Sequence, residues 1–357
     1  MTSKSYVPSP VKIKVIGLGG AGCNAVTRMV REQIRGVEFI VMNTNAAHLA
    51  ITEAALRVQL GKKITQGIGA GGDHQLGSRA AEESHDEIKQ VVNGADMVFV
   101  AAGMGGGTGT GSAPMVADIA KRSGALTIAF VTKPFKFEGT RRNQVAEEGI
   151  CNLIDKVDAL IIIPNENLLQ ISDRKMSIDD TFKMADEVLF HGVRAITDLV
   201  TMPGLINLDY ANIRTVMKDA GQAWMSIGKG SGPNRAVDAV KDALASPLMD
   251  ISIKGAKRVL FNVTGGSDLT LAEVKGAAEI IQGAIAPEAN VIFGVVLDPN
   301  MGNETRITLI ATGFTDQEAL TGAAREKEIL RLLKDKSEDE LDVPPLLRQR
   351  RVPPGHQ

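Results

Sequence analysis

Short apolar runs alternate with amphipathic stretches along the first half of the chain, and this alternation restricts the fold more than any other feature. Runs of four to six residues, rich in β-branched side chains, occupy positions 12–16, 39–42, 97–102, 126–131 and 159–163. All but the first are apolar apart from Thr127, which is typical of strands buried on both faces. Helical patterns at 79–92 and 112–123 end at glycine or asparagine. The pattern predicts an α/β fold with a Rossmann-like parallel sheet covered by helices.

The second half of the chain follows a different order. A long helical pattern at 179–201 follows two candidate caps, Ser177 and Asp179, and we expect a buried central helix there. Beyond it the pattern predicts, in order, strand 223–227, helix 234–245, strand 259–263, helix 271–285 and strands 291–297 and 306–311. We expect a smaller α+β domain that ends in an antiparallel pair of strands.

Charge and composition exclude several classes of protein. The chain has 357 residues, with Lys+Arg 40 against Asp+Glu 42. A nucleic-acid-binding protein needs a clear basic excess, so we expect no nucleic-acid partner. No apolar run approaches the roughly 18 residues that span a bilayer, and no signal peptide is apparent. Two cysteines suffice neither for a disulfide framework nor for a four-ligand zinc site. We expect a cytoplasmic protein with no metal site of its own and no direct membrane insertion.

A glycine loop follows the first predicted strand. Gly17-Leu-Gly19-Gly20-Ala-Gly22 fits the dinucleotide fingerprint, in which bare backbone and a helix N-terminus bind a phosphate. A tight turn without a ligand is the alternative. An NAD site would need an acidic residue at the end of the second strand, but Met42-Asn43-Thr44-Asn45 stands there. The NAD interpretation is therefore weakened.

A second glycine loop joins strand 97–102 to the next helix. It has six glycines in the nine residues 103–111, with Thr108 and Thr110 as possible hydroxyl donors. So many glycines cost conformational entropy, and they allow the backbone to approach a bulky anion. No Walker motif is present. Two such loops on neighbouring strands predict one site that holds a long polyphosphate.

The sequence Gly-Gly-Gly-Thr-Gly-Thr-Gly at 105–111 is the signature of the tubulin/FtsZ family, and the chain resembles that family's bacterial division GTPases from Val11 to Phe314. The resemblance implies the tubulin/FtsZ fold, with GTP or GDP bound together with Mg²⁺. It implies a flexible arm at 1–10, a GTP-binding domain at 11–178, the central helix at 179–203, a GTPase-activating domain at 204–314, a linker at 315–340 and a partner-binding peptide at 341–357.

Site residues follow from the same resemblance. The phosphates are assigned to Gly20, Ala21, Gly22, Cys23 and Asn24 on the first loop, and to Gly107, Thr108 and Gly109 on the second. Cys23 is also explained as a small buried filler. Glu138 resembles the ribose ligand and Arg142 its phosphate neighbour, although a surface pair at helix spacing is the alternative. Asn165, Phe182 and Asp186 resemble the guanine pocket, where Phe182 is as easily a core residue.

Asn207-Leu-Asp209-Tyr-Ala-Asn212 resembles the family's catalytic loop, with Asn212 where the family has a second aspartate. An amide cannot take a proton from water, so Asp209 would polarise the attacking water with Asn207 beside it. A helix over 179–201 is about 35 Å long, so Asp209 should lie roughly 30 Å from its own nucleotide. It can therefore act only on the nucleotide of a neighbour in a head-to-tail filament.

Three functions follow from these motifs. The first is a GTPase whose filaments form the division ring at mid-cell, with activity that depends on polymerisation. The second is a GTP-bound structural filament that hydrolyses very slowly because of Asn212. The third is an NAD-linked oxidoreductase, which rests on the first glycine loop alone. In the tail, 341–348 resembles the peptide that docks on membrane-tethering division proteins, and a solvated proline-rich end is the alternative.

Overall fold

The structure is a computed structural model that describes residues 11–34, 36–171, 177–201, 209–246 and 253–314. Residues up to Phe314 belong to one compact unit. The arm at 1–10, the linker at 315–340, the peptide at 341–357 and Asn207 lie outside the described residues. Within the described residues, no helix combines the length and the apolar character needed to cross a membrane.

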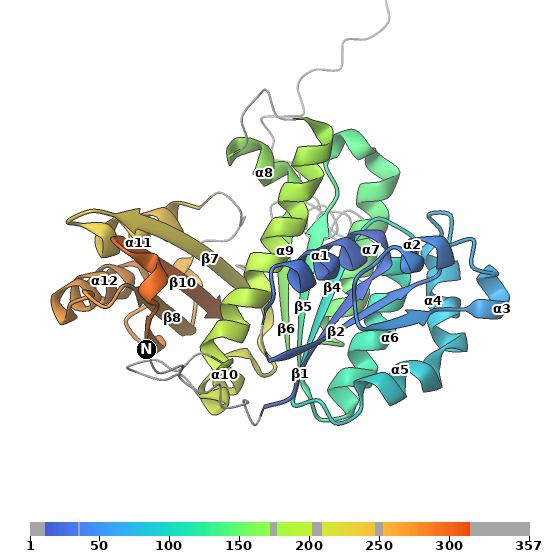
Figure 1. Ribbon diagram of the computed structural model, residues 1–357, viewed down its shortest axis with the longest axis horizontal. Coiled ribbons are helices and arrows are strands. Elements are labelled where there is room, and N and C mark those ends of the chain that lie inside the picture. The colour runs from blue at the N-terminus through green and yellow to red at the C-terminus, as the bar shows by residue number, and fades with distance from the viewer. Residues whose placement is uncertain (1–10, 35, 172–176, 202–208, 247–252, 315–357) are drawn as a thin grey trace, which may run out of the picture. The chain divides into compact units, whose positions relative to one another are not determined.

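One ten-stranded sheet runs through the unit in the order β3-β2-β1-β4-β5-β6-β7-β10-β8-β9 (Figure 1). The strands are β1 Ile13–Leu18, β2 Val37–Asn43, β3 Leu56–Gln59, β4 Met97–Gly103, β5 Leu126–Lys133, β6 Ala159–Pro164, β7 Gly221–Ser231, β8 Arg258–Gly265, β9 Asn290–Leu297 and β10 Glu304–Thr312. The strands from β3 to β7 are all parallel. The predicted Rossmann-like α/β fold is confirmed, and β3 is a strand that the sequence pattern did not reveal.

Helices cover both faces of the parallel part. They are α1 Gly19–Arg31, α2 Ala46–Ala50, α3 Lys62–Thr65, α4 His74–Glu83, α5 His85–Val92, α6 Thr108–Arg122, α7 Thr140–Ile154, α8 Asn165–Ile171, α9 Ile178–Thr201 and α10 Tyr210–Met217. One buried cluster joins the sheet to α1, α9 and α10, and a second joins its other face to α4, α5, α6 and α7. The sheet is therefore buried on both sides, which explains its apolar strands.

Two predicted helices differ from the observed ones. The pattern at 79–92 belongs to two helices, α4 and α5, which are separated by Ser84, and the Ser84 hydroxyl accepts a 2.9 Å hydrogen bond from Gly61 N. The helix predicted from 112 begins at Thr108, so the last residues of the second glycine loop form its first turn. The central helix α9 agrees with its prediction, and Ser177 caps it by accepting a 3.1 Å hydrogen bond from Asp180 N.

The predicted antiparallel pair of strands at the end of the second domain is wrong. Strand β10 lies between β7 and β8 and is antiparallel to both, whereas β9 pairs in parallel with β8. β10 is buried along nearly its whole length, whereas the first half of β9 is exposed or half-buried, as expected of a strand at the edge of a sheet. The sequence of β9 is nevertheless the more apolar of the two, so apolar content alone does not predict which strand lies inside the sheet.

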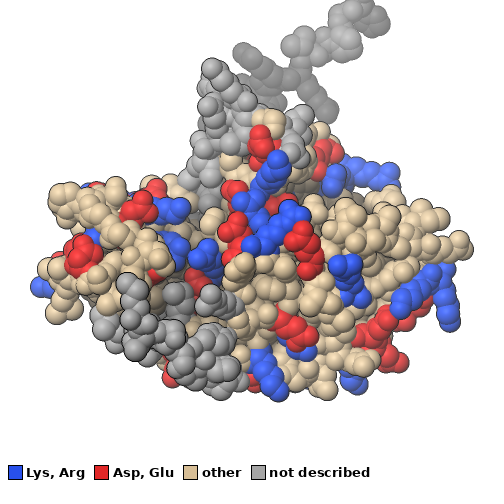
Figure 2. All heavy atoms as spheres, viewed as in Figure 1, with Lys and Arg blue, Asp and Glu red and all other residues tan. Residues whose placement is uncertain are grey.

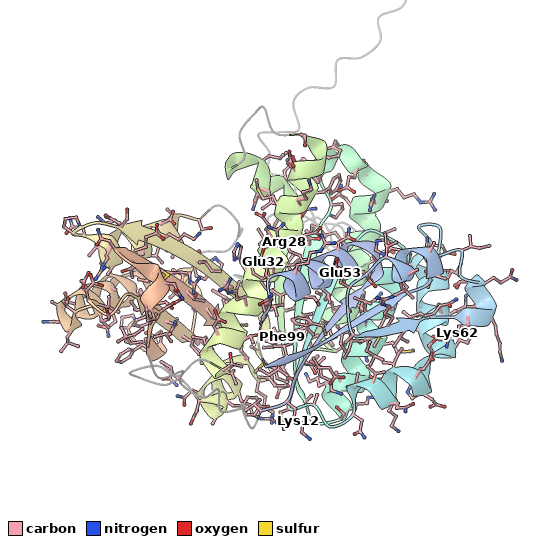
Figure 3. The ribbon with its side chains drawn as sticks, in the orientation of Figure 1. Lys12, Arg28, Glu32, Glu53, Lys62 and Phe99 are labelled. Atoms are coloured by element: carbon pink, nitrogen blue, oxygen red, sulfur yellow. The ribbon has the colours of Figure 1, made fainter. Side chains whose placement is uncertain are left out.

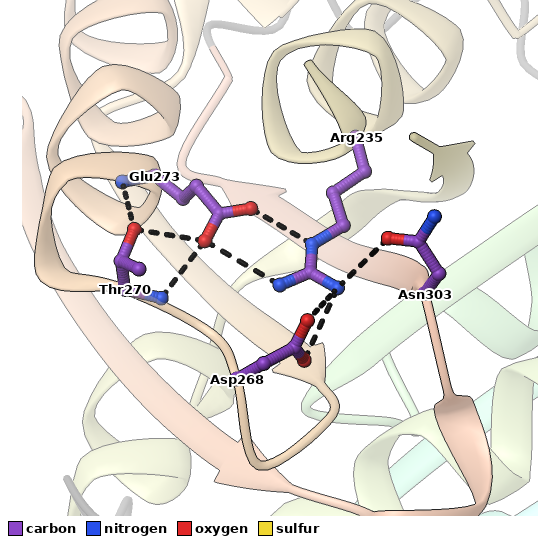
Figure 4. A network of polar contacts seen from close by, with 5 residues as sticks. All are labelled: Arg235, Asp268, Thr270, Glu273 and Asn303. Carbon is purple, nitrogen blue, oxygen red and sulfur yellow. Dashed lines mark hydrogen bonds and ion pairs between the residues drawn. The ribbon is translucent and has the colours of Figure 1, made fainter. Parts of the chain in front are cut away.

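Helices α11 Arg235–Ala245 and α12 Leu271–Ala284 pack on this second part of the sheet. Arg235, whose side chain is 4% exposed, joins them (Figure 4). Its Nε donates to Glu273 Oε1 at 2.8 Å, and its Nη1 lies 3.0 Å from an Asp268 carboxylate oxygen. Glu273 also accepts from Thr270 N at 2.8 Å at the start of α12. The network ties the first turns of both helices to the loop after β8.

Candidate functional site

The carboxyl ends of the parallel strands open onto one pocket of about 380 Å³. Among the residues that line it are most of those predicted from the sequence: Gly20, Ala21, Asn24, Gly107, Thr108, Gly109, Glu138, Arg142, Asn165, Phe182 and Asp186. Gly22 and Cys23 are not in the lining. This edge of a parallel sheet is where nucleotides bind in doubly wound folds.

The first glycine loop presents bare backbone to the pocket. A Cβ built on Gly20 would meet no atom within 4 Å, so the space in front of this residue is open. Helix α1 begins here without a side-chain cap, which leaves its first N–H groups available to an anion. Gly22 has a different role: its Cβ would lie 2.2 Å from Ala101 O, so glycine allows α1 to pack closely against β4.

Cys23 is fully buried, as expected of a small filler. Burial raises the pKa of its thiol to about 12, against the weaker lowering effect of a hydrogen bond from Asn43. The thiol therefore stays protonated, and it is unreactive in this environment.

The two threonines of the second glycine loop make different contacts. Thr108 lines the pocket, and its hydroxyl lies 2.6 Å from that of Thr44. The Thr110 hydroxyl instead accepts a 2.9 Å hydrogen bond from Gly105 N and fixes the loop internally. A Cβ on Gly106 would meet no atom within 4 Å, so this residue, like Gly20, leaves room for a ligand.

A third segment that sequence reasoning missed also lines the pocket. It comprises Ala70, Gly71 and Gly72, which precede α4. Both glycines have positive φ, +56° and +83°, and open space beside them. The glycines at 69, 71 and 72 could have indicated this segment. Because no strand was predicted directly before them, the sequence gave no reason to expect a ligand there.

The end of the pocket near α8 and α9 carries an unpaired acceptor. Asn165 is 6% exposed, and its Oδ1 is buried without a hydrogen-bond partner within the protein. Such an atom costs free energy unless a ligand or water satisfies it. Phe182 is 41% exposed and meets Phe135 edge-on at 5.5 Å, so the interpretation as a core residue is wrong. The pocket thus offers an aromatic surface and a polar acceptor at one end.

Asp186 stands one helical turn after Phe182 on α9 and faces the same pocket. Burial raises the pKa of its carboxyl to about 7, and the nearby Arg28 guanidinium counteracts part of that rise. A carboxylate held at such a pKa gains stability from any ligand that donates hydrogen bonds to it.

Glu138 and Arg142 form the ion pair expected at helix spacing, with Oε2 and Nη1 2.9 Å apart. The Glu138 side chain is 8% exposed, and its Oε1 accepts a 2.8 Å hydrogen bond from Phe135 N. Both residues line the pocket, which an isolated surface pair would not do. The carboxylate is therefore held rigidly at the pocket edge.

Asp209 and Asn212, the described residues among those predicted to be catalytic, are not brought to this pocket. Asp209 caps α10, and its Oδ1 accepts a 2.8 Å hydrogen bond from Asn212 N. The neighbouring Tyr210 donates from its hydroxyl to Asp96 O at 2.8 Å. Asp96 directly precedes β4, whereas pocket residue Gly103 ends that strand. Asp209 and the pocket are therefore at opposite edges of the sheet, separated by a strand about 20 Å long.

Comparison with known proteins agrees with this geometry. Residues 12–173 match the family model described as the Tubulin/FtsZ family GTPase domain, and residues 221–315 match the FtsZ family C-terminal domain. An empty FtsZ dimer from M. jannaschii is 44% identical, with a TM-score of 0.81, over 85% of this chain and 88% of that one.

Two more distant structures from Haloferax volcanii share the fold. GDP-bound CetZ1 is 22% identical with a TM-score of 0.78, over 90% of this chain and 100% of that one. A CetZ2 protofilament with bound GTPγS is 20% identical with a TM-score of 0.76, over 92% of this chain and 100% of that one. The family models and the 44% identity together show that this chain belongs to the tubulin/FtsZ family.

Proposed function

We propose that this chain is a self-polymerising GTPase whose active site is completed by a second copy. The observation that carries the proposal is the separation of Asp209 from the pocket, because the Tyr210–Asp96 contact holds α10 at the opposite edge of the sheet. A carboxylate at that distance cannot act on a nucleotide in its own chain. Stacking two chains head to tail would bring one chain's Asp209 to the other's pocket, and such a contact repeats into a filament.

The pocket residues support guanine nucleotides as ligands. Phosphates would lie against the first turns of α1 and α6, where Gly20 and Gly106 leave open backbone. At the other end, the Asp186 carboxylate would accept hydrogen bonds from guanine N1–H and N2–H₂, with Phe182 against the base. Adenine lacks this pair of donors, so ATP would leave a buried acceptor unpaired. Glu138 would hold the ribose, and Mg²⁺ would be bound chiefly through the phosphates and water.

We assign the catalytic role to Asp209, together with Asn212 and Asn207, acting on the nucleotide of the neighbouring chain. Asp209 Oδ1 is occupied by the cap of α10, which holds the carboxylate in a fixed direction. Hydrolysis would require the filament contact, and loss of the terminal phosphate would weaken that contact. GTP turnover would therefore be activated by polymerisation.

In the cell, such filaments would form the division ring at mid-cell. The match to the FtsZ family C-terminal domain favours this role among those of tubulin-like proteins. The peptide at 341–357 would dock on membrane-tethering division proteins, which would bring the filament to the membrane without direct insertion.

Specific activity measured against protein concentration tests the shared site. Phosphate release per molecule should be very low in dilute solution and should rise steeply where filaments appear by light scattering. A folded sample whose rate per molecule stays constant down to nanomolar concentration would contradict the proposal.

Asn212 favours a second candidate, a GTP-bound structural filament with very slow hydrolysis. Its side chain is an amide at the third position of α10, so Asp209 is the single carboxylate of the motif. Phosphate release per polymerised subunit separates the two candidates, because only the slow filament would persist with GTP unhydrolysed.

A further inference from the structure

Arg28 connects the helix that follows the first glycine loop to the helix that carries Asp186. It lies on α1 one turn after the pocket residue Asn24, and its Nη2 donates to Glu187 Oε1 on α9 at 2.6 Å. In Figure 3 Arg28 lies where α1 passes beside α9, and Figure 2 shows basic and acidic side chains gathered over this region. The ion pair therefore joins the two helices that would hold opposite ends of the nucleotide.

One N–H donor of the Arg28 guanidinium is not used by the protein at the contact between α1 and α9. Arg28 Nε is buried without a hydrogen-bond partner, although the side chain as a whole is one-third exposed. Asp186 directly precedes Glu187, and within the described residues its carboxylate accepts no hydrogen bond from the protein. The positive charge of Arg28 acts on Asp186 and opposes the effect of burial on its pKa.

We propose that Arg28 is a positioning residue for guanine recognition. It holds the part of α9 that carries Asp186 against α1, and it stabilises the negative charge of the Asp186 carboxylate. The inference rests on the proposed role of Asp186 in binding guanine. Only the ionised carboxylate can accept both guanine donors, so a residue that favours the ionised form favours guanine.

Other charges near Asp186 have partners of their own. Glu187 on the same helix pairs with Arg28, and Lys183, one turn earlier, pairs with Asp180 at 3.3 Å. Across the pocket, Arg142 pairs with Glu138. Among the described residues, Arg28 is the charge that lowers the pKa of Asp186. Removing it should raise that pKa further and move guanine binding to higher pH.

The test is GDP binding to the full-length, unpolymerised chain, measured by calorimetry between about pH 6 and pH 9. With the Asp186 pKa at about 7, affinity of the unaltered protein should rise roughly tenfold from pH 6 to pH 8. Arg28→Met keeps an unbranched apolar side chain close in size to the aliphatic part of arginine and removes its charge. Its profile should move upward by about one pH unit, so that GDP binds about fivefold more weakly at pH 7 and nearly normally at pH 9.

Three variants make the test specific. Arg28→Lys restores the charge and should return the profile toward that of the unaltered protein. Glu187→Gln breaks the ion pair but keeps Arg28, so its profile should stay in place or move to lower pH. Arg31→Met, on the same helix, removes an arginine paired with the exposed Glu53 at 2.6 Å and should leave the profile unchanged.

Two failures can be distinguished. If Arg28→Met weakens GDP binding equally at every pH, or has no effect, the inference is wrong while the guanine site stands. If the unaltered protein binds ADP as well as GDP, or Asp186→Ala retains selectivity for GDP, the guanine site and the inference both fail. Should Arg28→Met not fold, as judged by circular dichroism, Arg28→Gln replaces it, with the same upward move of the pH profile expected and with Arg28→Lys as the variant that keeps the charge; an unmoved profile for Arg28→Gln would overturn the inference.

Discussion

The hydroxyl of Tyr210 donates a 2.8 Å hydrogen bond to the main-chain oxygen of Asp96. This contact joins the first residue of α10 to the residue just before β4, at the amino edge of the parallel sheet. The glycine loops lie at the carboxyl edge of the same strands. This hydrogen bond therefore holds Asp209, the candidate catalytic carboxylate, at the end of the strands opposite the pocket.

If the site is shared, two inactive variants should restore activity when mixed. Asp209→Asn keeps the α10 cap, because asparagine caps as well as aspartate, but removes the carboxylate. Asp186→Ala keeps Asp209 but impairs the nucleotide pocket. An equal mixture should recover up to about a quarter of normal turnover, since that share of random junctions has both intact halves. GTP hydrolysis in the mixture is measured against each variant alone, and no recovery would argue for a site within one chain.

If the proposed catalytic role of the Asp209 segment holds, Asn212→Asp should raise GTP turnover, because it would place a second carboxylate near the attacking water. General-base assistance is worth about 10²–10⁴-fold, and Asp209 already supplies part of it, so we expect a gain near or below the low end. The new charge stands at the third position of α10, where the helix dipole stabilises it by about 0.3–1 kcal/mol.

The measurement for Asn212→Asp is phosphate release per polymerised subunit at matched polymer mass. Filaments of the unaltered protein should persist longer after GTP addition than those of the variant. Equal rates would show that Asn212 does not limit hydrolysis, and the slow-filament candidate would then be withdrawn.

Asp186 should make the nucleotide-free protein less stable as pH rises. Its pKa is raised to about 7 in the folded state, so between roughly pH 4 and pH 7 the folded chain holds a proton that the unfolded chain has released. The free energy of unfolding therefore falls with rising pH across that window. Asp186→Asn removes this dependence, and at pH 8 the variant should be more stable by about 1 kcal/mol, allowing for partial exposure.

Thermal unfolding without nucleotide at about pH 5 and pH 8 checks this prediction. The melting temperatures should differ clearly at pH 8 and much less at pH 5, because most of the window between pH 4 and pH 7 lies above pH 5. A variant that is less stable than the unaltered protein at both pH values would contradict the assigned effect of burial.

Two glycines of the second loop should respond differently to alanine. A Cβ at Gly111 would lie 2.1 Å from His74 O in the first turn of α4, so Gly111→Ala must displace that helix and should cost about 1–3 kcal/mol or more. At Gly106 the Cβ would enter open space, so Gly106→Ala should fold normally but weaken GDP binding. Urea unfolding and GDP titration of both variants make the comparison, and normal GDP binding by Gly106→Ala would place the phosphates elsewhere.

The sequence by itself determined the parallel sheet, because strands buried on both faces are almost continuously apolar, as 97–102 is and as 126–131 is apart from Thr127. It also indicated both glycine loops. Ordering many glycines costs much conformational entropy, so such a run is expected where the backbone must approach a ligand or a neighbouring helix closely. These are local properties, readable within a few residues.

Only the tertiary structure decided the relationships between distant segments. The position of β10 between β7 and β8 depends on pairing between strands far apart in the sequence, which local patterns do not encode. The exposure of Phe182 and the contact of Arg28 with Glu187 depend on how α9 packs against the rest of the domain. The loop containing Gly71 reaches the pocket from a segment with no strand before it. Each results from packing between residues far apart in the chain, and such packing is settled by the free energy of the whole fold.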